Sequence, residues 1–99
     1  MAFKDVYNFE LLKNQAEQLV IQELEVQIEA AGPDVCRCDE CIVDMAAIAL
    51  NTVKPLYRFS LLGTQYAAAQ AMEDPAYMKS IERAVASGIE KVSSNPAHD

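Results

Sequence analysis

The chain has 99 residues, of which 52% are apolar and 23% charged, a composition that predicts one globular domain and excludes a disordered chain. Its formal net charge of −7 repels phosphate backbones, so we expect no DNA or RNA binding. No apolar run reaches the roughly 18 residues that span a bilayer, and the N-terminus is acidic where a signal peptide is basic, so we expect a cytoplasmic protein without a membrane partner.

The first expected element is one long helix over residues 6 to 30. Its apolar residues recur at spacings of three and four and form one face: Val6, Phe9, Leu12, Ala16, Leu19, Val20, Leu24 and Ile28. Gly32 and Pro33 end this helix, with Gly32 expected as a left-handed cap. A helix of about 25 residues is roughly 37 Å long, more than a domain of this size covers. We therefore expect part of the apolar face to meet a second copy of the chain, in a homodimer.

A second helix is expected over residues 40 to 52, after a connector at residues 34 to 38. Asp39 is the expected N-cap, and Pro55 follows the end of the helix. Apolar side chains lie on nearly all sides of this segment, so we expect it to be the buried central helix.

The rest of the chain predicts a short extended segment and more helix. Residues 56 to 62 alternate with a period of two, which is typical of a strand, and residues 64 to 72 are strong helix formers. Asp74 and Pro75 form a helix start, and the helix is expected to end near Ser93. The sequence thus predicts one mainly α domain of three to four helices, with strand or coil at residues 56 to 62.

All three cysteines, Cys36, Cys38 and Cys41, fall within the hexapeptide CRCDEC. Because the cytoplasm keeps thiols reduced, disulfides are not expected. Thiolates bind zinc, and both the helix start at Cys41 and the nearby Arg37 favour the thiolate form. We predict a structural zinc site that ties the connector to the second helix; a redox-active or regulatory thiol cluster and thiols without a ligand are the alternatives.

The fourth zinc ligand is open, because a closed structural site takes four ligands. The single histidine, His98, is one candidate, although it lies in a tail whose simpler interpretation is a disordered end. Asp34, Asp39, Asp44, a water molecule or a residue of a partner chain are the others. We expect no enzyme, since the sequence offers no nucleophile and base pair.

The cysteines belong to a longer pattern, C-x-C-x₂-C-x₂-D-x₅-L-N, which runs from Cys36 to Asn51 and is followed by Pro55 and Tyr57. With the acidic helix before it, this pattern resembles the late competence protein ComFB family over residues 8 to 59. The resemblance implies a small, mostly helical homodimer with zinc held by the cysteine cluster. Some members of that family carry a fourth cysteine nearer the C-terminus, and this chain has none.

The resemblance also implies a ligand, because some members of the family are receptors for cyclic dinucleotides, cyclic di-GMP among them, and affect competence, motility or cell size. Such a ligand has two-fold symmetry, which a homodimer matches. Arginine suits its phosphates and guanine edges, and aromatic rings stack on its bases. The expected ligand-binding residues are Arg58, Tyr57, Asn51, Lys54 and Asp44, in a protein that relays the signal to a protein partner.

Each of these residues also has a simpler interpretation. Arg58 fits a solvated strand residue, Tyr57 a core or dimer contact, Asn51 a helix cap, and Asp44 a residue that binds backbone or orients the metal ligands. The competing function is a protein–protein adaptor in competence or motility regulation that has no small ligand, which the acidic surface also fits.

Overall fold

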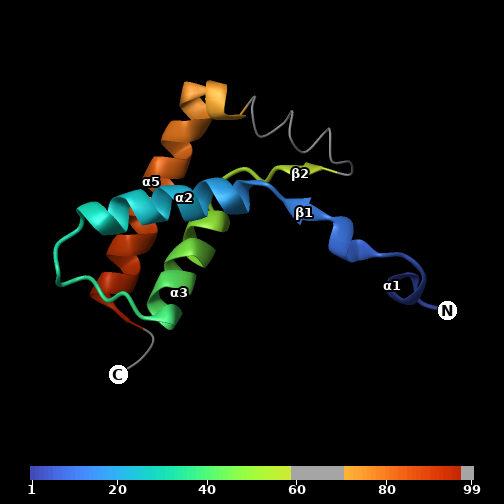
Figure 1. The fold of residues 1–99 in the computed structure, drawn as a ribbon, viewed down its shortest axis with the longest axis horizontal. Helices are drawn as coiled ribbons and strands as arrows, with labels where there is room; N and C mark the ends of the chain where they lie inside the picture. The colour runs from blue at the N-terminus through green and yellow to red at the C-terminus, as the bar shows by residue number, and fades with distance from the viewer. Residues whose placement is uncertain (59–70, 97–99) are drawn as a thin grey trace.

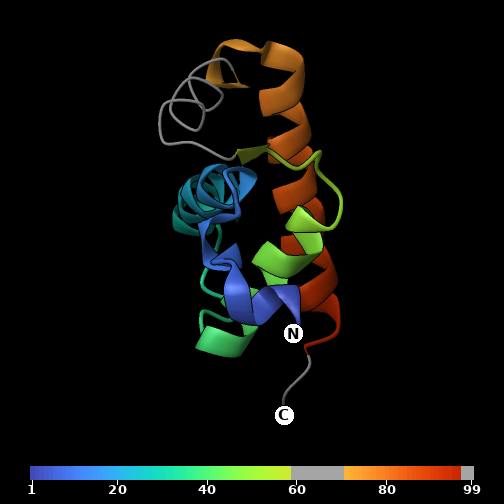
Figure 2. The same ribbon diagram turned by 90° about the vertical axis from the view of Figure 1, so that its right-hand side faces the viewer.

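The computed structural model of the chain describes residues 1–58 and 71–96 (Figure 1). Three helices form its body: α2 (Ala16–Ala30), α3 (Asp39–Leu50) and α5 (Pro75–Ser94). α3 packs most extensively against α5, and α2 crosses and contacts both (Figures 1 and 2). The prediction of a mainly α fold is confirmed. No helix in the described part of the chain is long and apolar enough to cross a membrane.

The core lies where these three helices meet. Its largest fully buried side chains are Met45, Ile81, Val20, Val85 and Cys41. Gly88 lies at the contact between α5 and α3, where a Cβ atom would be 2.7 Å from the carbonyl oxygen of Met45. Glycine at this position therefore lets the two helix backbones approach closely.

The N-terminal region differs from the prediction of one helix over residues 6 to 30. Before α2 the chain forms α1 (Phe3–Val6), the 3-10 helix η1 (Phe9–Leu11) and strand β1 (Lys13–Asn14). α2 itself has 15 residues. The prediction was wrong for the first ten residues of the segment, and the length of the helix no longer supports contact with a second copy.

Two asparagine side chains explain the break. The Oδ1 atom of Asn8 accepts a hydrogen bond of 3.1 Å from the backbone N–H of Glu10. Asn14 Oδ1 accepts one of 3.1 Å from the N–H of Ala16 and one of 2.8 Å from the N–H of Leu56. Such side-chain bonds compete with helical backbone bonds, so the chain bends at both asparagines before α2 begins.

Strand β2 (Tyr57–Arg58) pairs antiparallel with β1. The register sets Lys13 opposite Arg58 and Asn14 opposite Tyr57. This confirms a strand at the start of the predicted extended segment, and residues 59 to 62 lie outside the described residues. The pairing ties the chain before α2 to the chain after α3.

α3 begins one residue earlier than predicted and is not buried on all sides. Cys38, rather than Asp39, is its N-cap. Its buried residues, Cys41, Met45 and Ala49, repeat every four positions and form a single inner face. Val43 on the opposite side is 64% exposed, because α2 and α5 leave that side of α3 uncovered. The prediction that this segment is the buried central helix was therefore wrong for its outer side.

The prediction for α5 is confirmed. The Asp74 carboxylate accepts hydrogen bonds from the backbone N–H groups of Ala76 and Tyr77, Pro75 takes the first helical position, and the helix ends at Ser94. The helix expected over residues 64 to 72 lies mostly outside the described residues, and residues 71–73 are helical.

Candidate metal centre

The three thiols converge at the start of α3. The Sγ atoms of Cys36, Cys38 and Cys41 all lie within 4.8 Å of one another. Cys36 and Cys38 are half-buried in the connector, and Cys41 is buried in the first turn of the helix. Cys38 Sγ also accepts a hydrogen bond of 3.4 Å from the backbone N–H of Cys41, so the cap of α3 is itself one of the three thiols. The structure therefore confirms the predicted clustering.

The connector that carries two of the thiols is held by Arg37. Its guanidinium donates from Nη2 to the carbonyl oxygens of Ile28, at 2.8 Å, and Ala31, at 3.4 Å, and from Nη1 to that of Val35, at 3.2 Å. A cation among the last carbonyls of a helix is favourable, because these groups are the negative end of the helix dipole. Arg37 thus caps α2.

This role replaces two predictions. Gly32 does not adopt a left-handed conformation, and α2 ends through the extended residue Ala31 instead. Arg37 was expected to favour the thiolate form of the cysteines, whereas its guanidinium donates these hydrogen bonds to backbone carbonyls. A basic residue soon after a helix end is a known capping signal and could have pointed to this role.

The thiols differ in how readily they lose a proton. Hydrogen bonds to its sulfur from the Cys38 backbone, and then from the thiols of Cys38 and Cys41, lower the pKa of Cys36. Burial raises the pKa of the Cys41 thiol to about 12, and hydrogen bonding with the other two thiols adds to the rise. A thiolate therefore forms first at Cys36. A metal cation bound at the centre of the cluster would favour deprotonation of the other two thiols as well.

The arrangement fits a zinc ion. Tetrahedral zinc with sulfur ligands at about 2.3 Å places those sulfurs about 3.8 Å apart, so small side-chain rotations would suffice. Soft thiolate donors also select zinc over magnesium or calcium. In the described ranges no further histidine or acidic side chain joins the cluster, so Asp34, Asp39 and Asp44 are not brought to it. His98 lies outside those ranges.

The predicted ligand-binding residues lie in more than one place. Tyr57, which is 50% exposed, lines a mainly polar depression of about 460 Å³ together with Lys13, Asn14 and Gln18. Arg58 follows Tyr57 in β2, opposite Lys13. Lys13 was not among the predicted site residues, because only the strand pairing brings it beside Tyr57.

The other three residues lie elsewhere on the surface. Asp44 lines a separate shallow depression with Asp39, Glu40 and Val43. Asn51 is the C-cap residue of α3, as its simpler interpretation has it. Lys54 is exposed, and its carbonyl oxygen accepts a hydrogen bond of 2.8 Å from the Tyr77 hydroxyl.

An apolar groove of about 580 Å³ runs between α2 and α3. Most of its lining is aliphatic and includes Ile21, Leu24, Ile28, Ile42, Val43 and Leu50. Ile21 is 49% exposed, which is unusual for a residue that faces other aliphatic side chains. We call this feature the α2/α3 groove.

Comparison with known proteins gives one family and one fold. The sequence model of a family described as late competence development protein ComFB matches residues 13–96. The solved structure of the late competence protein ComFB from Bacillus subtilis is similar to 87% of this chain and to 92% of that chain, with a TM-score of 0.74 and 23% identity. At 23% identity, the similarity between the two structures shows that they share a fold and nothing further. The search of curated proteins gave no match.

Proposed function

Because the chain belongs to the ComFB family of late competence development proteins, we propose that it is a signalling protein that binds a cyclic dinucleotide. Cyclic di-GMP is the favoured ligand, and the bound state is relayed to a protein partner. The protein acts as a homodimer with a structural zinc ion at the cysteine cluster. The proposal assigns no catalytic activity to the chain.

The observation that best supports a cyclic dinucleotide site is the surface around the β1–β2 pair. The strand register sets two basic residues, Lys13 and Arg58, at directly opposite positions, and an anion bound there would offset the repulsion expected between like charges. The exposed ring of Tyr57 and the amides of Asn14 and Gln18 line the same depression as Lys13. A phosphate, a base face and a base edge are the groups that such side chains bind.

The zinc ion has a structural role in this proposal. Cys36, Cys38 and Cys41 would hold it, and it would supply a fixed bond between the connector and the first turn of α3. His98, a water molecule or a residue of the second copy would provide the fourth ligand. Arg37, which belongs to the same connector, donates a hydrogen bond to a carbonyl oxygen at the end of α2. By fixing the connector to α3, the ion would therefore also stabilise the packing of α2 against α3.

The homodimer is supported by the uncovered α2/α3 groove. Val43 and Ile21 expose about half or more of their surfaces there. Apolar surfaces of this kind on small soluble domains commonly mark association sites. A two-fold dimer also offers its binding groups twice, as a two-fold ligand requires.

A calorimetric titration of the zinc-loaded protein with cyclic di-GMP, and with cyclic di-AMP as the comparison, tests the function. We expect binding in the low micromolar range or tighter, with one ligand per dimer or per chain. If folded, zinc-loaded protein gives no heat with either ligand, the proposal fails. The exposed apolar groove then favours the second candidate, an adaptor that binds proteins only.

A further inference from the structure

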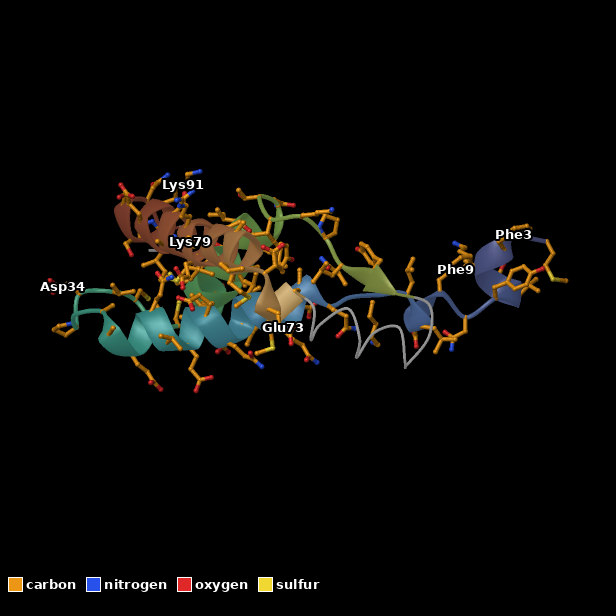
Figure 3. All side chains as sticks on the ribbon, turned by 90° about the horizontal axis from the view of Figure 1, so that it is seen from above. Phe3, Phe9, Asp34, Glu73, Lys79 and Lys91 are labelled. Carbon is orange, nitrogen blue, oxygen red and sulfur yellow. The ribbon has the colours of Figure 1, made fainter. Side chains whose placement is uncertain are left out.

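The N-terminal arm, residues 1–12, carries many apolar side chains that the described structure leaves uncovered. No residue of the arm is buried. Seven of its twelve residues are large hydrophobics more than half exposed: Met1, Phe3, Val6, Tyr7, Phe9, Leu11 and Leu12. Figure 3 shows Phe3 and Phe9 at the end of the molecule that points away from the three helices. Such a density of exposed apolar surface calls for a partner surface.

The direction of the arm is fixed at its base. The β1–β2 pairing and the two hydrogen bonds of Asn14 hold the chain just before α2. From there the arm extends away from α2 and α3 (Figures 1 and 3). To reach the α2/α3 groove of its own copy, the arm would have to reverse at this anchored point. A groove on a second copy requires no such reversal.

The α2/α3 groove has the chemistry that the arm needs. Its lining is mainly aliphatic, and Val43, which is 64% exposed, stands at its surface. The arm supplies aromatic and aliphatic side chains, of which Leu11 is 71% exposed. Burying both sets together removes apolar surface from water on each chain.

Charge favours the arm over a second groove as the occupant. Glu17 and Glu25 line the groove, so two grooves packed face to face would bring four carboxylates together. Residues 1–12 contain one lysine and two acidic residues, a formal net charge of −1, so most of the net charge of −7 lies in the rest of the chain. The arm is therefore a mainly apolar segment that meets less repulsion from an acidic groove than a second groove with its two glutamates would.

We propose that two copies of the chain exchange their N-terminal arms, with each arm lying in the α2/α3 groove of the other copy. The two contacts are related by one two-fold axis, as in other exchanges of identical elements between protomers. This inference rests on the proposed homodimer and goes beyond it, since it names the segment that fills the groove.

Sedimentation equilibrium of full-length variants provides the first test. Leu11→Gln alters the arm and Val43→Gln the groove, and both positions are exposed, so folding should be retained and is checked by circular dichroism. The matched control is Val26→Gln, which changes a valine of α2 that is 60% exposed and lies outside the groove. We expect each test variant to raise the dimer Kd at least tenfold, the double variant to add little more, and the control to change it less than twofold.

Photo-cross-linking identifies the chain that the arm contacts. A benzophenone side chain replaces Phe9, and unlabelled and ¹⁵N-labelled chains are mixed before irradiation. Cross-links between light and heavy chains, to peptides of α2 or α3, are the expected result. Cross-links within one chain only would show that the arm folds back on its own copy and would overturn the exchange.

The remaining outcomes separate this inference from the homodimer. A dimer whose Kd is unchanged by Leu11→Gln and Val43→Gln keeps the homodimer and overturns the exchange. A monomer at micromolar concentration overturns both. A flotation experiment with phosphatidylcholine–phosphatidylglycerol vesicles tests a third possibility. If the arm binds these vesicles, and Leu11→Gln abolishes that binding without weakening the dimer, the arm is a membrane contact and the exchange is overturned.

Discussion

The Nη2 atom of Arg37 donates a hydrogen bond of 2.8 Å to the carbonyl oxygen of Ile28, so the residue between two thiols of the cluster closes the end of α2. This one side chain joins the helix that lines the groove to the connector that carries the metal ligands. The α2 terminus and the cysteine cluster are therefore expected to respond together when the bond is removed.

Replacing Arg37 with alanine should lower the free energy of unfolding by about 1 to 2 kcal/mol, at the low end for hydrogen bonds to a charged group because Arg37 is exposed. Zinc affinity should also fall, because the connector loses its attachment to α2. Urea unfolding with and without zinc measures both effects. Arg83→Ala, on the exposed side of α5, is the control and should change either quantity little. Equal behaviour of the two variants would show that the capping contact contributes nothing.

Gly88→Ala should be strongly destabilising. The added Cβ atom would lie 2.7 Å from the Met45 carbonyl oxygen. α3 and α5, which form the most extensive contact between two helices, would then have to move apart. We expect a loss of about 1 to 3 kcal/mol, as for other overpacked cores. Gly32→Ala is the matched control, since nothing lies within 4 Å of its added Cβ. Thermal unfolding of the two variants checks the difference, and a Gly88→Ala protein as stable as the control would refute the close approach.

Local signals in the sequence predicted part of this fold well. Asp74 and Pro75 lie next to the helix they start, so α5 could be located from its own residues. The thiol cluster was also predictable, because its three members fall within six residues. In both cases the interacting groups are near neighbours along the chain.

Distant contacts explain what the sequence did not predict. Asn14 bonds to the backbone of Leu56, 42 residues away, and this contact turns a predicted helix into a strand. The same pairing brings Lys13 beside Tyr57, which no spacing reveals. From the sequence, Arg37 was interpreted as a neighbour of the thiols. Its partner at the end of α2 lies nine residues earlier in the chain and could not be identified from spacing.

The thiols of the metal-free protein should react in a definite order. Its lowered pKa makes Cys36 a thiolate at lower pH than an ordinary cysteine, whereas a pKa of about 12 keeps Cys41 protonated through neutral and mildly alkaline pH. Iodoacetamide labelling followed by mass spectrometry from pH 6 to about pH 10 should therefore modify Cys36 first and Cys41 last. Zinc should protect both residues. Labelling of Cys41 before Cys36, or no protection by zinc, would contradict the assigned centre.

Lys13 provides the sharpest test of the proposed ligand site, because its role follows from the strand pairing alone. Lys13→Gln removes a positive charge from the depression beside Tyr57 and leaves the backbone of β1 free to pair. If the depression binds the ligand phosphates, the affinity for cyclic di-GMP should fall at least tenfold, as it should for Arg58→Ala, and the loss should shrink at high salt. Lys79→Gln, at an exposed position of α5, removes the same charge elsewhere and should leave the affinity within twofold of the parent. If Lys13→Gln and Lys79→Gln weaken binding equally, the ligand senses only the overall charge, and the site lies elsewhere on the protein.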